Sequence, residues 1–360
     1  MARDFGVSPS VIFGVFSGAL LLSALLGPWV GGAIDRYGGR PVLVASSIVF
    51  AAGLALLGIA PSVAVVCLAW AFLGVGMSLG LYDTAFAALA GLYGRHARGA
   101  ITGITLMAGF ASTVGWPLTA SMTHGFGWRG ACLVWAGLHL LVGLPLTLAI
   151  PEAPGGRARH SNVELVSDPP PRWAMPALAY TFAATWFVTG SMAAHLPGLL
   201  VACGASPAAA VAAASLVGPA QVAARIAEWG FLRRAHPLVS ARLATIAHPL
   251  GALAIAVAGA PAIWTFSLLH GAGNGILTIA KGTVPLAVFG SHGYGVRQGI
   301  LSAPSRLVQA AAPFLFGLVL ERFGAHALLL STGLSLSALA ALAFLRAAPS
   351  EASSAVPAEA

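Results

Sequence analysis

Long apolar stretches recur along almost the whole chain, each separated from the next by a short polar or Gly/Pro-rich break. A membrane-spanning helix takes about 20 apolar residues, and these stretches reach that length. The residue types AVILMFWYC make up 58% of the 360 residues and DEKR only 8%, so one water-soluble core could not bury the apolar side chains. Because only helices satisfy the backbone at such lengths in hydrocarbon, the sequence predicts an all-α membrane protein.

Eleven membrane-spanning helices are predicted from these stretches. The predicted spans are residues 11–34, 42–60, 63–92, 100–123, 131–150, 173–196, 208–232, 241–259, 262–289, 300–320 and 325–345. The longest break, at 151–172, is polar and rich in proline, and it predicts a linker between two helix bundles. The bundles are then residues 1–150 and 173–346, followed by a tail at 347–360 that is expected to be disordered.

An internal repeat supports two related bundles. Arg98, Ile101, Pro117 and Gly127 correspond to Arg297, Ile300, Pro313 and Gly324. The offset stays at about 200 residues, as expected when one helix bundle is repeated in each half of the chain.

The arginines predict the orientation of the chain in the membrane. The formal net charge is +8, which by itself could suggest a nucleic-acid partner. Most arginines, however, lie in short loops on one side of the predicted membrane, which marks that side as cytoplasmic. The prediction is a multi-pass inner-membrane protein with its linker and C-terminus in the cytoplasm and no nucleic-acid partner.

The loop between the first two spans carries a recognisable motif, Gly31 to Arg40, which reads GGAIDRYGGR. It resembles the signature loop of the major facilitator superfamily, Gly-x-x-x-Asp-Arg-x-Gly-x-Arg, which joins helices 2 and 3 in that family. The resemblance implies a two-bundle fold of twelve helices, so the eleven predicted spans correspond to family helices 2 to 12, without helix 1. It also implies a conformational latch formed by Gly31, Asp35, Arg36, Gly38 and Arg40.

Two departures from the family pattern limit what the resemblance implies about mechanism. Trp70 stands where a frequent family motif in helix 4 has an arginine, so that proton-relay group is absent. The helix-5 motif often linked with antiporters is degraded to Gly109 followed by Gly115-Trp116-Pro117. Export by antiport is therefore possible but is not indicated.

Four ionisable residues fall inside predicted spans: Asp83, Arg225, Lys281 and Arg306. Each costs about 2.5–3.5 kcal/mol near the membrane centre, so each calls for a partner, water or a function. One interpretation is snorkelling and pairing between helices near the interface. The other starts from the internal repeat, which places Asp83 and Lys281 at similar depths with opposite charges, and predicts an inner gate or a coupling pair.

Polar residues on the helices expected to line the family's central cavity are the remaining candidates. His270, Asn274, Thr278 and Lys281 form one stripe at helical spacing. The predicted substrate-cavity and coupling residues are Tyr82, Asp83, Thr185, His195, Arg225, His270, Asn274, Lys281 and Arg306. The alternative is structural, since a histidine can bond between helices and a threonine commonly bonds its own helix backbone.

Three intramembrane cations against one carboxylate favour an organic or inorganic anion as the transported solute. Efflux of drug-like compounds or of a metalloid is the alternative, and a truncated, non-transporting or receptor-like protein is an alternative of another class. The single intramembrane carboxylate argues against an enzyme, and three scattered cysteines without CxxC spacing argue against a metal site. No cofactor is predicted, although an ion or proton gradient could drive transport, and a monomer is expected.

Overall fold

The computed structural model of the chain describes residues 1–152, 170–232 and 234–345. Over these ranges all regular structure is helical and none is strand, which confirms the all-α prediction. Most of the predicted linker and the whole predicted tail lie outside the described residues.

Seven α-helices make up the first bundle. They are α1 (Pro9–Tyr37), α2 (Gly39–Gly58), α3 (Val63–Gly80), α4 (Tyr82–Tyr93), α5 (Ala97–Gly109), α6 (Ala111–Leu138) and α7 (Leu144–Leu148). Two predicted spans are interrupted. The backbone becomes extended at Leu81 between α3 and α4, and the span 100–123 is divided at Phe110 between α5 and α6. The predicted loop after that span is instead a kink inside α6 at Gly127, whose φ of 68° favours glycine.

Seven further α-helices make up the second bundle. They are α8 (Ala174–Ala202), α9 (Pro207–Ser215), α10 (Val217–Ala227), α11 (Pro237–Ala258), α12 (Ile263–Phe289), α13 (Tyr294–Phe323) and α14 (Ala327–Phe344). Its core includes Leu199, Leu200, Phe266 and Phe316, all fully buried.

Eight helical segments among the described residues are long and apolar enough to cross a membrane. One of them, Tyr294–Phe344, contains the predicted span 300–320 and all but the last residue of the predicted span 325–345. Length and composition therefore support a multi-pass membrane protein, while the number eleven stays a prediction.

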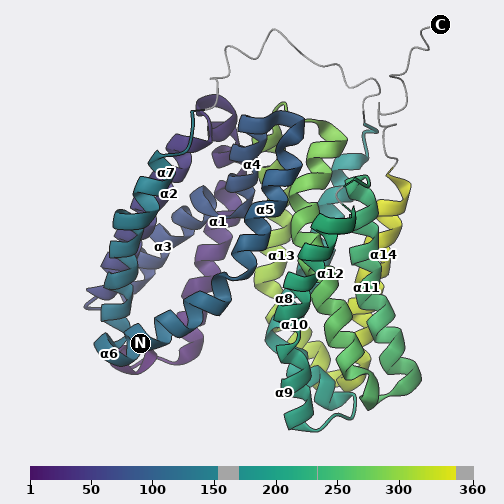
Figure 1. Cartoon of the computed structure of the whole chain (residues 1–360). Helices are drawn as coiled ribbons and strands as arrows, with labels where there is room; N and C mark the ends of the chain where they lie inside the picture. Colours follow the sequence, from purple (N-terminus) through teal and green to yellow (C-terminus); the bar gives the residue numbers. More distant parts are fainter. Residues whose placement is uncertain (153–169, 233, 346–360) are drawn as a thin grey trace, which may run out of the picture.

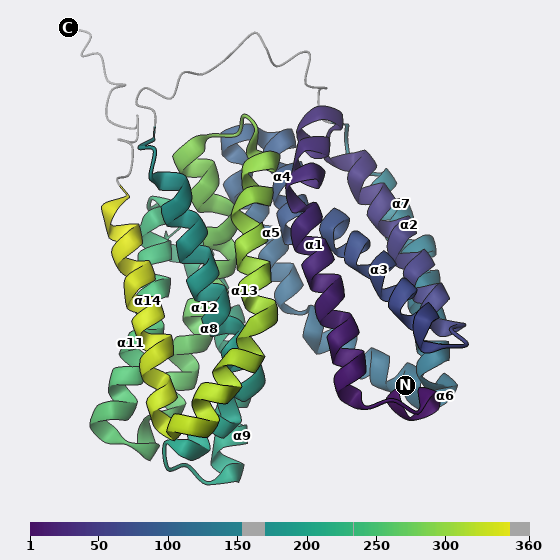
Figure 2. The same ribbon diagram turned by 180° about the vertical axis from the view of Figure 1, so that it is seen from behind.

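The two bundles converge at one end of the molecule and diverge at the other (Figures 1 and 2). They meet at the end where α4 and α5 lie beside the second bundle, and α1 runs beside α13 in both views. At the opposite end, the part of α6 that carries the label in Figure 1 lies far from α9.

Glycines let α1 and α13 touch through their backbones. A Cβ atom added to Gly31 would overlap the carbonyl group of Gly295, and one added to Gly299 would lie 2.5 Å from the carbonyl oxygen of Gly27. Neither position leaves room for a side chain, because the neighbouring atoms belong to backbone that cannot move alone. We call these four residues, together with Asp35, the glycine seam.

Candidate functional site

Asp35 closes the glycine seam by capping the first turn of α13. Its Oδ1 atom accepts a hydrogen bond from the Gly295 N–H group at 2.9 Å, and its Oδ2 atom accepts one from the Val296 N–H group at 2.9 Å. These N–H groups have no partner inside their own helix, and they carry the positive end of the helix dipole. The carboxylate of the first bundle thus satisfies the helix start of the second.

The other residues of the predicted latch do not contact α13 in the same way. Gly38 ends α1 with a φ of 85°, and the Arg36 guanidinium lies 5.1 Å from the centre of the Tyr37 ring. Arg40 pairs with Glu152 at 2.7 Å, and Glu152 is largely exposed, so this ion pair is worth little. Of the latch residues, Asp35 and Gly31 make the contact with α13.

Asp83 forms the centre of a buried charged cluster between the bundles. Its Oδ1 atom lies 3.2 Å from Lys281 Nζ on α12, and its Oδ2 atom lies 2.6 Å from Arg306 Nη2 on α13. The Gln298 side-chain amide also donates to Oδ1, at 3.1 Å. The structure therefore places Asp83 and Lys281 in contact, and their role as a gate or coupling pair stays a prediction.

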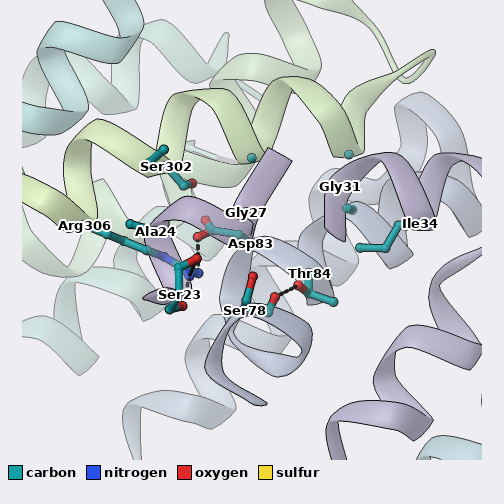
Figure 3. A pocket seen from close by; sticks show the side chains of 14 residues that line it. Ser23, Ala24, Gly27, Gly31, Ile34, Ser78, Asp83, Thr84, Ser302 and Arg306 are labelled. Atoms are coloured by element: carbon teal, nitrogen blue, oxygen red, sulfur yellow. Dashed lines mark hydrogen bonds and ion pairs between the residues drawn. The ribbon is translucent and has the colours of Figure 1, made fainter. Parts of the chain in front are cut away.

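Arg306 ties three helices together (Figure 3). Besides Asp83 on α4, it donates to the hydroxyl and the carbonyl oxygen of Ser23 on α1, the latter at 3.3 Å. The space left among these side chains and the seam glycines is about 10 Å³. That volume holds no more than one water molecule.

Lys281 reaches a third helix through an aromatic ring. Its Nζ atom lies 4.7 Å from the centre of the Trp186 ring on α8. A cation over an indole face is stabilised by the ring quadrupole. Lys281 is buried, and it connects α12 to both α4 and α8.

Arg225 crosses between the bundles without a carboxylate. Its Nη1 atom donates to the Thr105 carbonyl on α5 at 2.9 Å, and its Nε atom donates to the Gly275 carbonyl on α12 at 3.3 Å. The Thr278 hydroxyl lies at 3.4 Å from Nη2. Only 4% of the Arg225 surface is exposed. Its partners over the described residues are all neutral oxygens, so a buried positive charge remains uncompensated.

A further ion pair joins the bundles at the start of α5. Arg98 Nη2 lies 3.0 Å from Glu228 Oε1 and also donates to the Leu232 carbonyl at 2.9 Å. Glu228 is 1% exposed and accepts a further hydrogen bond from Ser240 at 3.3 Å. We call Arg98, Thr105, Arg225 and Glu228 the arginine contact.

Four predicted cavity residues lie instead between helices of the second bundle. The His270 ring bonds His248 on α11, and the side-chain oxygen Oδ1 of Asn274 accepts from the Thr189 hydroxyl. His195 bonds the Pro313 carbonyl, and Thr185 donates to the Thr181 carbonyl of its own helix. The predicted stripe on α12 is therefore divided. Packed helices cross at an angle, so one face of α12 meets the first bundle near Lys281 and its own bundle near His270.

Several partners of the charged cluster were not predicted from the sequence, among them Ser23 and Gln298. Neither is charged, so hydropathy alone does not mark them. The spacing of Gln298, Ser302 and Arg306 at four-residue intervals was an available signal, because it places all three on one face of a helix.

Comparisons with known proteins agree with this arrangement. The family model described as Major Facilitator Superfamily matches residues 1–303. Monocarboxylate transporter 3 of Rattus norvegicus is 30% identical over 176 residues, which are 45% of this chain and 35% of that protein. A Multidrug resistance protein B homolog of Mycobacterium tuberculosis (strain ATCC 25618 / H37Rv) is 32% identical over 164 residues, 44% of this chain and 29% of that protein. The matches thus span about a third of each curated relative.

Solved structures resemble the whole arrangement. The human organic anion transporter MFSD10 (TETRAN) has a TM-score of 0.75 at 20% identity, covering 95% of this chain and 87% of that one. The proton:xylose symporter XylE, bound to 6-bromo-6-deoxy-D-glucose, has a TM-score of 0.70 at 12% identity, covering 93% and 85%. At these identities the similarity shows the fold.

Proposed function

This chain belongs to the major facilitator superfamily, and we propose that it carries a small organic or inorganic anion across a membrane by alternating access. The observation that carries the proposal is Arg225, a buried cation between the bundles with only neutral oxygens as partners over the described residues. A desolvated guanidinium of this kind favours an anion nearby.

The charged cluster adds to the same electrostatic balance. Asp83 faces two cations, Lys281 and Arg306, so the cluster carries one positive charge more than it neutralises. Glu228 does not redress this balance, because it pairs with Arg98. The buried groups between the bundles therefore present a positive field to a solute entering from the open end.

The proposed movement opens the end of the molecule that is closed here. The glycine seam and the charged cluster hold the bundles together at that end, while the bundles diverge at the other (Figures 1 and 2). In the opposite state Asp35 would leave the start of α13, and Arg306 would leave Asp83. We place the closed end in the cytoplasm, following the distribution of arginines.

The names of two similar proteins are consistent with an anion. One is a monocarboxylate transporter and the other a human organic anion transporter. The similarity to a multidrug resistance homolog favours a second candidate, efflux of drug-like compounds, so the test includes a lipophilic cation.

Counterflow in proteoliposomes tests the proposal. Vesicles loaded with unlabelled L-lactate, acetate or phosphate are diluted into the same labelled anion, and a parallel set uses tetraphenylphosphonium. We expect an anion to accumulate in wild-type vesicles, at least tenfold less in Arg225→Gln, and to an intermediate extent in Arg225→Lys, which keeps the charge. Arg322→Gln, at the exposed end of α13, is the matched control and keeps wild-type counterflow. Exchange of the cation without any anion would contradict the proposal.

A further inference from the structure

Three helices of the second bundle meet around a buried chain of hydrogen bonds. His248 on α11 and His270 on α12 face each other, with their Nδ1 atoms 3.0 Å apart. The His248 Nε2 atom lies 3.0 Å from the hydroxyl of Ser331 on α14. Both imidazoles are 5% exposed, and they lie apart from the charged cluster described above.

The hydrogen bonds in this chain have one consistent direction. The Ser331 hydroxyl donates its single hydrogen to the Leu328 carbonyl at 3.0 Å, so its oxygen must accept from His248 Nε2–H. The His248 Nδ1 atom is then a bare acceptor, and its partner must be His270 Nδ1–H. In the neutral pair, this leaves His270 Nε2 without a hydrogen and able to accept a proton.

A small polar cavity adjoins the pair. Its volume is about 20 Å³, enough for one water molecule. Its polar lining comes from four helices and consists of Thr185, Thr189, Thr245, His248, His270, Asn274 and Ser335. A water molecule there would have enough hydrogen-bonding partners to deliver a proton to the pair.

The surroundings limit the pair to one added proton. The groups that face the pair are threonine and serine hydroxyls, the Asn274 amide and the Phe266 ring. Carboxylates and cations are not among the described residues that line the cavity. The Phe266 ring stacks on His270 with an interplanar angle of 8° and meets His248 edge-on. One imidazolium would be stabilised by this ring and by the neighbouring imidazole, whereas two would place like charges 3.0 Å apart.

We propose that His248 and His270 form a single proton-binding site in the second bundle. A proton from water adds to the free lone pair of His270 Nε2, and the resulting imidazolium keeps its Nδ1–H hydrogen bond to His248. A neutral water molecule or hydroxide is left behind, and no other bond is made or broken. This proposal rests on the geometry of the histidine pair alone, and it does not depend on whether the transported solute is an anion.

Differential proton titration of the full chain in detergent tests this site. Between pH 8 and pH 4, the wild type should bind one proton more than the His248→Gln/His270→Gln variant, because glutamine keeps hydrogen bonding but does not titrate. No difference for the double variant would overturn the proposal, as would a difference of two protons.

Nitrogen-15 NMR of the histidine rings keeps the proposal testable if the double variant does not fold. In the wild type at pH 8, one buried ring should carry its hydrogen on Nε2 and the other on Nδ1, and acidification should convert the pair to a single imidazolium. The single variants His248→Gln and His270→Gln assign the two signals. Two rings with the same tautomer, or two neutral rings throughout, would overturn the site.

Discussion

The glycine seam and the arginine contact join the same two bundles at the same end of the molecule, but by different chemistry. In the seam, Asp35 binds the backbone N–H groups at the start of α13. In the arginine contact, Glu228 binds a side chain, Arg98, at the start of α5. The internal repeat makes Arg98 and Arg297 corresponding residues, yet Arg297 turns back to the Gly290 carbonyl and the Phe289 ring.

This difference follows from how closely the helices approach. Where glycines bring α1 and α13 into backbone contact, a carboxylate can reach the helix start itself, and a long side chain has no room between them. On the other side, the equivalent space is filled by guanidinium groups, which reach across to carbonyls and to Glu228. The seam should therefore tolerate no side chain added at Gly31, Gly295 or Gly299. The arginine contact should instead lose stability in proportion to the charge left unpaired.

The largest effect is expected for Gly31→Val. Its side chain would overlap the Gly295 backbone, which cannot move alone, so the closed end could not form. Spin labels at the exposed residues Tyr37 and His292 should report a longer distance across this end in most molecules. Gly32→Ala is the matched control, because the nearest atom to a Cβ there is a Val296 side-chain carbon at 3.6 Å. An unchanged distance in Gly31→Val would show that the seam does not need backbone contact.

A second large effect is expected for Asp83→Asn. Two buried cations would lose their carboxylate, and removing one partner of a buried ion pair costs about 3–5 kcal/mol. We expect the variant to unfold at lower temperature and to lose counterflow. The exchanged pair Asp83→Lys with Lys281→Asp should recover part of both, because it restores the pairing near Arg306. If either single variant performs as well as the exchanged pair, Asp83 and Lys281 do not act together.

An asymmetric effect is expected in the arginine contact. Arg98→Gln leaves the Glu228 carboxylate buried and unpaired, whereas Glu228→Gln leaves Arg98, which is 21% exposed, with access to water. Arg98→Gln should therefore destabilise the protein more, by about 1–3 kcal/mol. Thermal unfolding of the two variants and of their combination measures this, and the combination should resemble Glu228→Gln alone. Equal losses in the two single variants would mean that both groups are hydrated.

The smallest effect is expected for Asp35→Asn. The asparagine carbonyl can accept from one of the two N–H groups at the start of α13, but the charge that favours the helix dipole is lost. The cost is about 1 kcal/mol, a shift of several-fold toward the open end. The same spin-label pair detects it, and Arg36→Gln, which lies outside the contact with α13, serves as control. If the spin-label distance increases as much as in Gly31→Val, the hydrogen bonds of Asp35, and not the packing of the glycines, hold this end closed.

Local patterns in the sequence predicted the features that depend on local residues. The all-α membrane class follows from the apolar stretches. The loop from Gly31 to Arg40 indicates the family, because its whole motif lies within ten consecutive residues. The buried charges Asp83, Arg225, Lys281 and Arg306 stand out because charge is costly inside an apolar helix. Asn274 and His270 stand out as polar residues in an apolar helix, but the sequence does not identify their partners.

Only the tertiary structure decided which groups meet. Asp35 binds residues 260 and 261 positions away, and Arg306 binds a serine 283 positions away. Such pairs depend on the tilt, rotation and separation of whole helices, which side-chain packing sets across the molecule. Hydropathy and helical spacing determine that a residue lies in a buried helix and on which face, whereas the crossing of the helices determines whether that face meets the other bundle or its own.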